Sequence, residues 1–480
     1  MSLKKKALSG FFWSSAGTMG NGLVNLTVTM ILARILSPTD FALIALLSIF
    51  STASEVIVDS GFSQAIIRDD NPSPKDLSSV FFFNLVLSII LYAILYCVSP
   101  SIAKFYDAPE LAQYSRVVFL VIIFNASTLI QSATLKRNLD FPTVEKSMVL
   151  GSVTAGIIAV VMALTGCGIW SLVANIVLMP LGRSIFLWFS SKWRPILTFS
   201  LGSIKKYFKF GIFLATNSLV DVIVMNLNSL LIGKVYTKND LGYYSQALKL
   251  DTYFATPIRS ILNKVIYPIT SKVKDNQAKL REAYGLMAGM LLFVSTPLLL
   301  FIYFNADSTI VFFFGEKWRD AGVYLRLLAL LELGQMLQNV FNNCILVTGK
   351  TNALLVATII KQGLRLLAIF CTINISVYAM ILGYTISGIL GSLIYSAMGM
   401  YFVKYNPLTL IKDNYKSLLA TAVSLGAIFI LRNLCDSMNE IMLFMLQIAL
   451  MTVSYILASI VLKNKYLTEI AVAIKSLKSR

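Results

Sequence analysis

The sequence predicts an all-α integral membrane protein with about 14 transmembrane helices, arranged as two six-helix lobes and a C-terminal helix pair. Three observations lead to this fold class. Hydrophobic residues make up 57% of the 480 positions and charged residues only 13%, whereas soluble proteins carry roughly 25% charged residues. Apolar stretches of about 20 residues, enough to cross a bilayer, recur along most of the chain. Polar residues at helical spacing run through several of these stretches.

The apolar stretches are expected to be helices because lipid offers no hydrogen-bond partner to an open backbone. The first stretch is too long for a signal peptide and contains Asn21 and Asn25, so it is read as a transmembrane helix. The spans 241–268 and 321–347 are the weakest because they contain several charged residues. In chain order the expected spans are 10–35, 41–64, 78–99, 113–135, 147–165, 168–190, 208–233, 241–268, 284–304, 321–347, 352–373, 376–403, 417–434 and 441–462.

The distribution of Lys and Arg predicts the orientation in the membrane. With the N-terminus in the cytoplasm and an even number of spans, most basic residues fall in cytoplasmic segments, as the positive-inside rule requires. Both termini are therefore expected in the cytoplasm. The net charge of +18 has the same origin, so nucleic acid is not an expected partner.

A faint internal repeat at an offset of 200 residues predicts the domain organisation. Ile31–Leu47 parallels Leu231–Leu248, with Asp40 aligned to Asp240. We expect lobes at residues 1–200 and 201–405, related by an axis along the membrane normal, and a terminal helix pair with a cytoplasmic tail at 406–480. Chance similarity between apolar segments is the alternative. The same offset aligns Asp59 with Arg259 as a candidate gating ion pair.

Polar stripes run along five of the expected helices. They indicate that one face of each of these helices is turned away from lipid. Facing lipid, each unpaired polar group would cost several kcal/mol, so the stripes face either packed protein or water. Polar contacts between packed helices are one alternative, and a shared aqueous cavity is the one we favour. The two clearest stripes are Ser14, Thr18, Asn21, Asn25 and Thr29 in the first span and Ser48, Thr52, Glu55, Asp59 and Ser63 in the second.

Charged and amide residues within the spans are the candidate functional residues, because each charge costs at least about 2.5 kcal/mol at that depth. Lys361 and Arg365 lie one turn apart and would repel unless an anion or an acid lies between them. The candidates for substrate binding are Asn21, Asn25, Lys249, Arg259, Asn339, Lys361 and Arg365. The candidates for coupling or gating are Glu55, Asp59, Asp221 and Glu332.

Several kinds of chemistry have no support in the sequence. The chain has no histidine, which removes histidine-based catalysis, metal sites and proton relays. Its five cysteines form no CxxC pair and no disulfide framework. We therefore expect no metal, no cofactor and no enzymatic activity.

Short motifs in a fixed order resemble those of bacterial Wzx-type polysaccharide flippases, the polysaccharide-transport branch of the multidrug/oligosaccharidyl-lipid/polysaccharide superfamily. The resemblance covers nearly the whole chain and is nearest to WzxC-like exporters. Each motif is weak alone, but the order and spacing are specific together. The motifs are Leu32–Leu36 with Pro38, Leu135–Phe141, Gly168–Val173, Leu241–Ala247 with Pro257, Val265–Pro268 and Phe314–Trp318.

The resemblance implies a transporter that flips a polyprenyl-diphosphate-linked oligosaccharide from the cytoplasmic to the external leaflet of the bacterial inner membrane. The mechanism that we expect is alternating access. The expected partners are the lipid-linked oligosaccharide, membrane lipid, and a glycan polymerase with its chain-length partners. A multidrug/cation antiporter of the same superfamily is the first alternative, although it would prefer an acidic cavity. A membrane-embedded sugar polymerase is the second, but the external connection at 305–320 is short for a catalytic domain.

Overall fold

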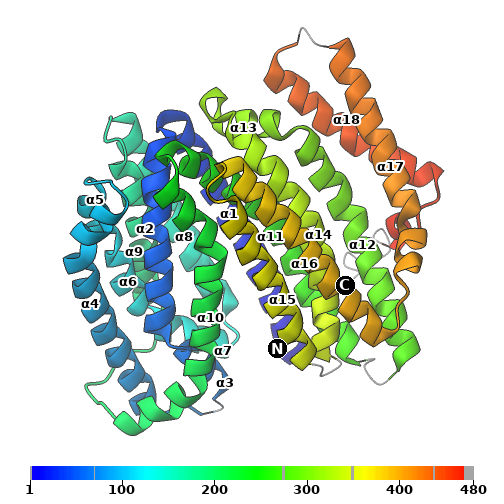
Figure 1. Cartoon of the computed structure of the whole chain (residues 1–480). Coiled ribbons are helices and arrows are strands. Elements are labelled where there is room, and N and C mark those ends of the chain that lie inside the picture. Colours follow the sequence, from blue (N-terminus) through cyan, green and yellow to red (C-terminus); the bar gives the residue numbers. More distant parts are fainter. Residues whose placement is uncertain (1–2, 70, 273–275, 348–350, 436–437, 470–480) are drawn as a thin grey trace. The chain divides into compact units, whose positions relative to one another are not determined.

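The computed structural model describes residues 3–69, 71–272, 276–347, 351–435 and 438–469. All regular secondary structure in these ranges is helical (Figure 1), which confirms the predicted all-α fold class. The chain divides into two compact units, residues 1–245 and residues 246–480. This boundary lies inside one long helix, whereas the predicted lobes begin a new repeat at residue 201. The predicted lobes describe a repeat and stay a prediction.

The first unit begins with a helical hairpin and continues through a series of long and short helices. Its core contains Phe62, Phe81, Ile130 and Tyr207, which come from four different helices. The helices are α1 (Leu3–Ile35), α2 (Pro38–Asp59), α3 (Phe62–Arg68), α4 (Pro74–Phe105), α5 (Leu111–Val118), α6 (Leu120–Ala126), α7 (Leu129–Arg137), α8 (Phe141–Leu164), α9 (Trp170–Ser190) and α10 (Leu201–Val235), and the unit includes the start of α11 (Lys238–Lys272).

The second unit contains the rest of α11 and the C-terminal helices. Tyr284, Met336, Phe341 and Met400 belong to a hydrophobic core where three long helices meet. Its elements are α12 (Gln277–Phe304), α13 (Ala306–Phe314), the 3₁₀-helix η1 (Glu316–Trp318), α14 (Ala321–Val347), α15 (Thr351–Thr372), α16 (Val377–Val403), α17 (Pro407–Leu434) and α18 (Glu440–Val461).

Eleven helical segments among the described residues are long and apolar enough to cross a membrane. The three other expected spans coincide with α1, α11 and α14, which have 33, 35 and 27 residues. Two of these are the spans that sequence analysis singled out for their charges. The chain is thus a multi-pass membrane protein, and the expected count of about 14 spans stays a prediction.

The two repeated hairpins begin their second helices in the same way. Ser37 N donates to Asp40 Oδ2 at 2.9 Å, and Asp40 N donates back to Ser37 Oγ at 3.3 Å. At the offset of 200, Thr237 N donates to Asp240 Oδ2 and Asp240 N to Thr237 Oγ1, both at 3.2 Å. This reciprocal capping satisfies backbone donors that no helical carbonyl can reach. Asp40 and Asp240 therefore cap the start of the second helix of each hairpin in the same way.

Three expected segments differ from the structure. The span 41–64 ends early, because Ser60 and Gly61 have φ values of 46° and 72° and separate α2 from α3; Ser63 therefore lies outside the α2 stripe. The span 113–135 is interrupted by turns and becomes α5, α6 and α7. The connection 305–320 is mostly helical, since α13 and η1 occupy it.

Helix α10 packs along α2 and also contacts α3 and α4 (Figure 1). The backbones approach closely where Gly61 meets Gly211, since a Cβ on Gly211 would lie 2.2 Å from the carbonyl oxygen of Ser60. Only glycine permits this contact. The first helix of the expected second lobe therefore packs within the first compact unit.

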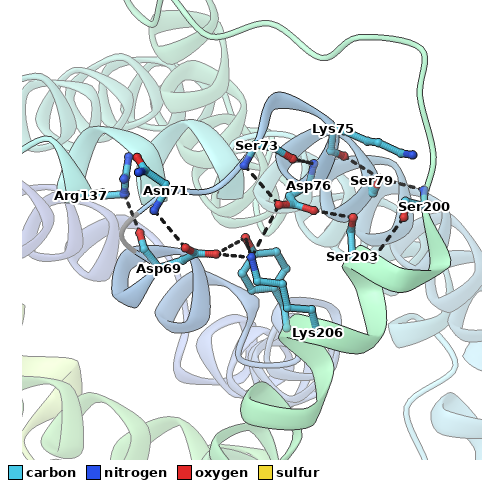
Figure 2. A network of polar contacts seen from close by, with 11 residues as sticks. Asp69, Asn71, Ser73, Lys75, Asp76, Ser79, Arg137, Ser200, Ser203 and Lys206 are labelled. Carbon is cyan, nitrogen blue, oxygen red and sulfur yellow. Dashed lines mark hydrogen bonds and ion pairs between the residues drawn. The ribbon is translucent and has the colours of Figure 1, made fainter.

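Polar contacts fasten the N-terminal end of α10 to the loop between α3 and α4 (Figure 2). Lys206 Nζ and the Tyr207 hydroxyl both donate to Asp69 Oδ2, at 2.6 and 2.7 Å. Ser203 Oγ donates to Asp76 Oδ1 at 2.5 Å. On the other side of the loop, Arg137 Nε donates to the Asp69 carbonyl at 2.9 Å. We call Asp69, Asp76, Ser203, Lys206 and Tyr207 the α10 latch.

The C-terminal helices α17 and α18 pack against each other and against α12 and α13. The Tyr455 hydroxyl donates to the Phe293 carbonyl at 2.7 Å, and Asn464 Nδ2 donates to Ser417 Oγ at 2.9 Å. The first is a polar contact between packed helices, and the second joins the segment after α18 to α17. Of the predicted cytoplasmic tail, residues 470–480 lie outside the described residues.

Candidate functional site

Two basic side chains of α15 are buried at the interface with α16 in the second unit. Lys361 is 7% exposed and Arg365 is 9% exposed. Two glycines one turn apart on α16 make room for them. A Cβ on Gly391 would lie 2.6 Å from Lys361 Cγ, and a Cβ on Gly388 would lie 3.3 Å from Arg365 Nη2. The sequence of α16 therefore permits the burial of charges that lipid would reject.

The two buried bases are compensated to different degrees. Lys361 Nζ donates to Gln338 Oε1 at 2.6 Å, and Ser392 Oγ donates to the same oxygen at 2.9 Å. The Arg365 guanidinium lies over the Tyr384 ring at 4.6 Å, a favourable cation–π contact. However, Nε and Nη2 of Arg365 are buried without a hydrogen-bond partner among the described residues. Arg365 is therefore an incompletely compensated cation.

An ion pair between a half-buried arginine and a buried glutamate joins α11 to α14 in the same unit. Arg259 Nε donates to Glu332 Oε1 at 2.8 Å, and Arg259 Nη2 contacts Glu332 Oε2. Glu332 is only 1% exposed, so removal of its partner would leave an uncompensated charge and cost about 3–5 kcal/mol. Arg259 was predicted for substrate binding and Glu332 for coupling or gating. The structure joins them in one bidentate ion pair. Arg259, Glu332, Gln338, Lys361 and Arg365 are called the basic cluster below.

The basic cluster presents mainly hydrogen-bond donors. Lysine and arginine side chains have no acceptor. The oxygen of Gln338 already accepts from Lys361 and Ser392, which leaves its NH₂ group as the available end. Arg259 engages Glu332 through two of its nitrogens. A ligand rich in acceptors and negative charge matches this set.

The first unit contains a separate cavity of about 490 Å³ with both acidic and basic walls. Asn125 Nδ2 donates to Glu55 Oε1 at 2.7 Å, and Asp59 Oδ1 accepts from Ser63 N at 3.1 Å. Arg183 Nη2 donates to Ser132 Oγ at 2.9 Å. Glu55 and Asp59, both predicted for coupling or gating, therefore line one cavity together with Lys136 and Arg183.

The polar stripe of α1 makes contacts typical of helix packing. Asn25 Nδ2 donates to the Asn21 carbonyl at 2.9 Å and to Asn21 Oδ1 at 3.2 Å. The Ser152 hydroxyl of α8 donates to the same Asn21 oxygen. Gly156 allows α8 to approach α1, since a Cβ there would lie 2.4 Å from Val28 Cγ2. Of the two alternatives for this stripe, the contacts favour polar packing, and its substrate role stays a prediction.

The remaining predicted residues take no part in the contacts described above for the basic cluster and the first-unit cavity. Asp221 lies on α10 and is exposed, while Lys249 on α11 and Asn339 on α14 are half-buried. The candidate gating pair of Asp59 with Arg259 also stays a prediction, and Arg259 is engaged with Glu332 of its own unit.

Sequence reasoning missed Gln338, Asn125 and Tyr384. The expected span 321–347 carries a polar stripe of Glu332, Gln335, Asn339 and Asn342, and Gln338 lies beside this stripe at helical spacing. Asn125 lies in the span 113–135, which also contains Gln113, Gln131 and several hydroxyl residues, and no polar stripe was assigned to that span. The ring of Tyr384 carried no signal, because an aromatic residue in a transmembrane helix is ordinary.

The comparisons with known proteins identify the family. Residues 31–323 match the model of a family described as polysaccharide biosynthesis protein. The chain belongs to this family. It is 27% identical over 427 residues to the teichuronic acid biosynthesis protein TuaB of Bacillus subtilis (strain 168), which covers 88% of each chain. It is 24% identical over 364 residues to the lipopolysaccharide biosynthesis protein WzxC of Escherichia coli (strain K12), with 73% of this chain and 72% of the relative covered.

A solved structure supports the same conclusion about the fold. The chain is similar to the lipid II flippase MurJ in an inward closed conformation, with a TM-score of 0.69 and 15% identity. The similarity covers 93% of this chain and 97% of MurJ. The family resemblance inferred from sequence motifs is thus confirmed, and the fold is that of a membrane transporter.

Proposed function

We propose that this member of the polysaccharide biosynthesis family flips a polyprenyl-diphosphate-linked oligosaccharide from the cytoplasmic to the external leaflet. The observation that carries the proposal is the donor-rich basic cluster of the second unit. A diphosphate offers several anionic acceptors, and Arg365 offers uncompensated donors at membrane depth. Arginine can bind phosphate oxygens through two parallel hydrogen bonds.

The flipped unit would then serve surface polysaccharide assembly. In this proposal the protein lies in the bacterial inner membrane with cytoplasmic termini, and a glycan polymerase with chain-length partners consumes its product. Alternating access would expose the bound head to one side of the membrane at a time. An inside-negative potential favours outward movement of an anion by about 2.3 kcal/mol per charge per 100 mV. Glu55, Asp59, Asp221 and Glu332 remain the candidates for coupling or gating.

The proposal is tested by removing the charges of α15 while keeping the side-chain length. The double variant Lys361→Gln/Arg365→Gln is expected to reach the membrane at a normal level but to lose surface polysaccharide. A matched double variant of exposed bases, Lys279→Gln/Lys412→Gln, is expected to export normally. Polymer at the cell surface and lipid-linked intermediate inside the cell are measured together. Normal surface polymer in the first variant would refute the role of the cluster.

A multidrug/cation antiporter is the alternative that shares this superfamily. It would need a cavity that attracts cations, and Lys361 and Arg365 would repel them. Expression of the chain in a drug-sensitive host distinguishes the two functions. Raised drug resistance, which Glu332→Gln abolishes, would favour the antiporter.

A further inference from the structure

The cavity of the first unit differs chemically from the basic cluster of the second. Its walls include the carboxylates of Glu55 and Asp59 and the cationic side chains of Lys136 and Arg183. Glu55 Oε1 accepts from Asn125 Nδ2 and Asp59 Oδ1 accepts from Ser63 N, whereas the second oxygen of each carboxylate has no hydrogen-bond partner among the described residues. Acceptors are therefore available on one part of the wall.

Donors are available on the same wall. Arg183 uses Nη2 for Ser132, but its Nε is buried without a hydrogen-bond partner in the described part of the chain. Lys136 is exposed and lines the cavity at the end of α7. A buried donor without a partner destabilises the protein. A ligand that supplies the missing acceptor would offset part of this destabilisation.

The rest of the cavity wall is apolar. It is formed by aliphatic and thioether side chains, among them Val58, Ile122, Leu129, Met148, Ile176 and Met179. At about 490 Å³ the cavity lies within the range of small-molecule sites, about 300–1,000 Å³. It is large enough for more than a single ion or water molecule.

The mixture of acidic and basic groups on the cavity wall argues against two simple ligands, a metal cation and a polyanion. A metal cation would be repelled by Arg183 and Lys136, and the described residues contain no group of three candidate metal ligands. A polyanion would be repelled by Glu55 and Asp59. A neutral molecule whose groups both donate and accept satisfies both signs of charge, and hydroxyl groups do this. A sugar ring also has apolar C–H faces for the aliphatic wall.

We propose that the first-unit cavity binds sugar residues of the transported glycan through their hydroxyl groups. The inference rests on the proposed function and adds a division of labour to it. Hydroxyls, which donate and accept, fit the mixed walls of the first unit, whereas phosphate, which only accepts, fits the donor-rich cluster of the second.

The test uses the full chain in lipid nanodiscs and two soluble probes. One probe is the reducing oligosaccharide that mild acid releases from the host's lipid-linked pool. The released oligosaccharide carries no phosphate. The other is inorganic diphosphate. Met179→Trp, which fills the cavity, is expected to weaken oligosaccharide binding at least tenfold in calorimetry and to leave diphosphate binding unchanged. Lys361→Gln/Arg365→Gln is expected to show the reverse pattern.

A second measurement does not depend on filling the cavity. The variant Lys136→Cys places a thiol at the exposed rim of the cavity. Maleimide labelling of the wild-type protein gives the background from the native cysteines. The oligosaccharide is expected to slow maleimide labelling of Cys at this position at least threefold, and diphosphate is expected to have no effect.

The outcomes separate this inference from the proposed function. Unchanged oligosaccharide affinity in Met179→Trp, or no protection at position 136, would overturn the sugar site whatever happens at the basic cluster. Loss of gradient-dependent flipping in Glu55→Gln with unchanged oligosaccharide binding to the same variant would assign the cavity to coupling and would also overturn the sugar site. Failure of diphosphate binding alone would instead count against the proposed function.

Discussion

The residue that most strongly indicates a ligand is Arg365. Its side chain is 9% exposed, and two of its nitrogens have no acceptor among the described residues. Cation–π contact with Tyr384 offers about 0.5–2 kcal/mol, less than the cost of leaving charged donors unpaired. A protein that only needed helix packing would gain stability from a smaller or apolar residue at this position.

Gln338 is expected to act as a positioning residue for Lys361. Gln338→Leu removes the acceptor that Lys361 and Ser392 share, so the ammonium group loses a hydrogen bond of about 1.5–3 kcal/mol. We expect diphosphate affinity to fall about tenfold or more by calorimetry on the purified protein, with thermal unfolding shifted downward.

The variant Gln338→Glu separates the effect of Gln338 on diphosphate binding from its effect on the stability of the fold. The carboxylate still accepts from Lys361, so the fold is expected to unfold near the wild-type temperature. The new negative charge pairs with Lys361 and repels phosphate, so diphosphate binding should be lost. If Gln338→Glu bound diphosphate as well as the wild type, Lys361 would not be part of the anion site.

At the scale of elements, the α15–α16 interface decides whether the basic cluster can form. Gly391→Ala is expected to force α16 away from Lys361, since the new Cβ would lie 2.6 Å from Lys361 Cγ. Overpacking of this kind costs about 1–3 kcal/mol. Lower thermal stability and lower export should therefore appear together.

Gly363 on α15 is the matched control for this substitution. A Cβ at Gly363 would meet nothing within 4 Å, and alanine in a helix interior is favoured over glycine by about 0.5–1 kcal/mol. Gly363→Ala is therefore expected to raise the unfolding temperature slightly and to leave export unchanged. A similar loss of stability in both variants would show that the contact with Lys361 is not what destabilises Gly391→Ala.

The α10 latch is expected to hold over a wide pH range. The hydrogen bonds from Lys206 and Tyr207 lower the pKa of Asp69 to about 2, and the bond to Asp69 raises the pKa of Lys206. An aspartate in an unfolded chain titrates near pH 3.9 and a lysine near 10.4. The Asp69 contribution is therefore complete above about pH 4 and is lost as the pH falls toward 2, and the Lys206 contribution is lost above about pH 10.

Hydrogen exchange tests the latch directly. In the wild type, amides after the first turn of α10 should stay protected from pH 5 to 9, after correction for the intrinsic exchange rate. Asp69→Asn removes the charge that Lys206 and Tyr207 contact, and exchange in the first turns of α10 should rise several-fold at pH 7. Lys279→Gln, an exposed substitution in the other unit, serves as the control and should leave these amides unchanged.

At the scale of the whole molecule, the fold class followed from the sequence because hydropathy and backbone satisfaction leave few choices in lipid. Local signals also held, as the capping of Asp40 and Asp240 shows. Turns inside spans did not follow, because the break at Gly61 depends on the approach of Gly211, which is distant in sequence. The pairing of Arg259 with Glu332 could not be predicted either. Periodicity shows which residues share a face of one helix, but it does not show which other helix packs against that face.

The orientation of the whole molecule gives the last prediction. If both termini are cytoplasmic, a fluorescent protein fused after Arg480 should fluoresce, and alkaline phosphatase fused there should be inactive. Phosphatase fused within the α4–α5 connection, after Asp107, should be active, because an odd number of spans precedes it. The same enzyme fused after Lys192, between α9 and α10, should be inactive. Activity after Lys192 would mean that one span before α10 does not cross the membrane, and the positive-inside assignment of the first unit would then be wrong.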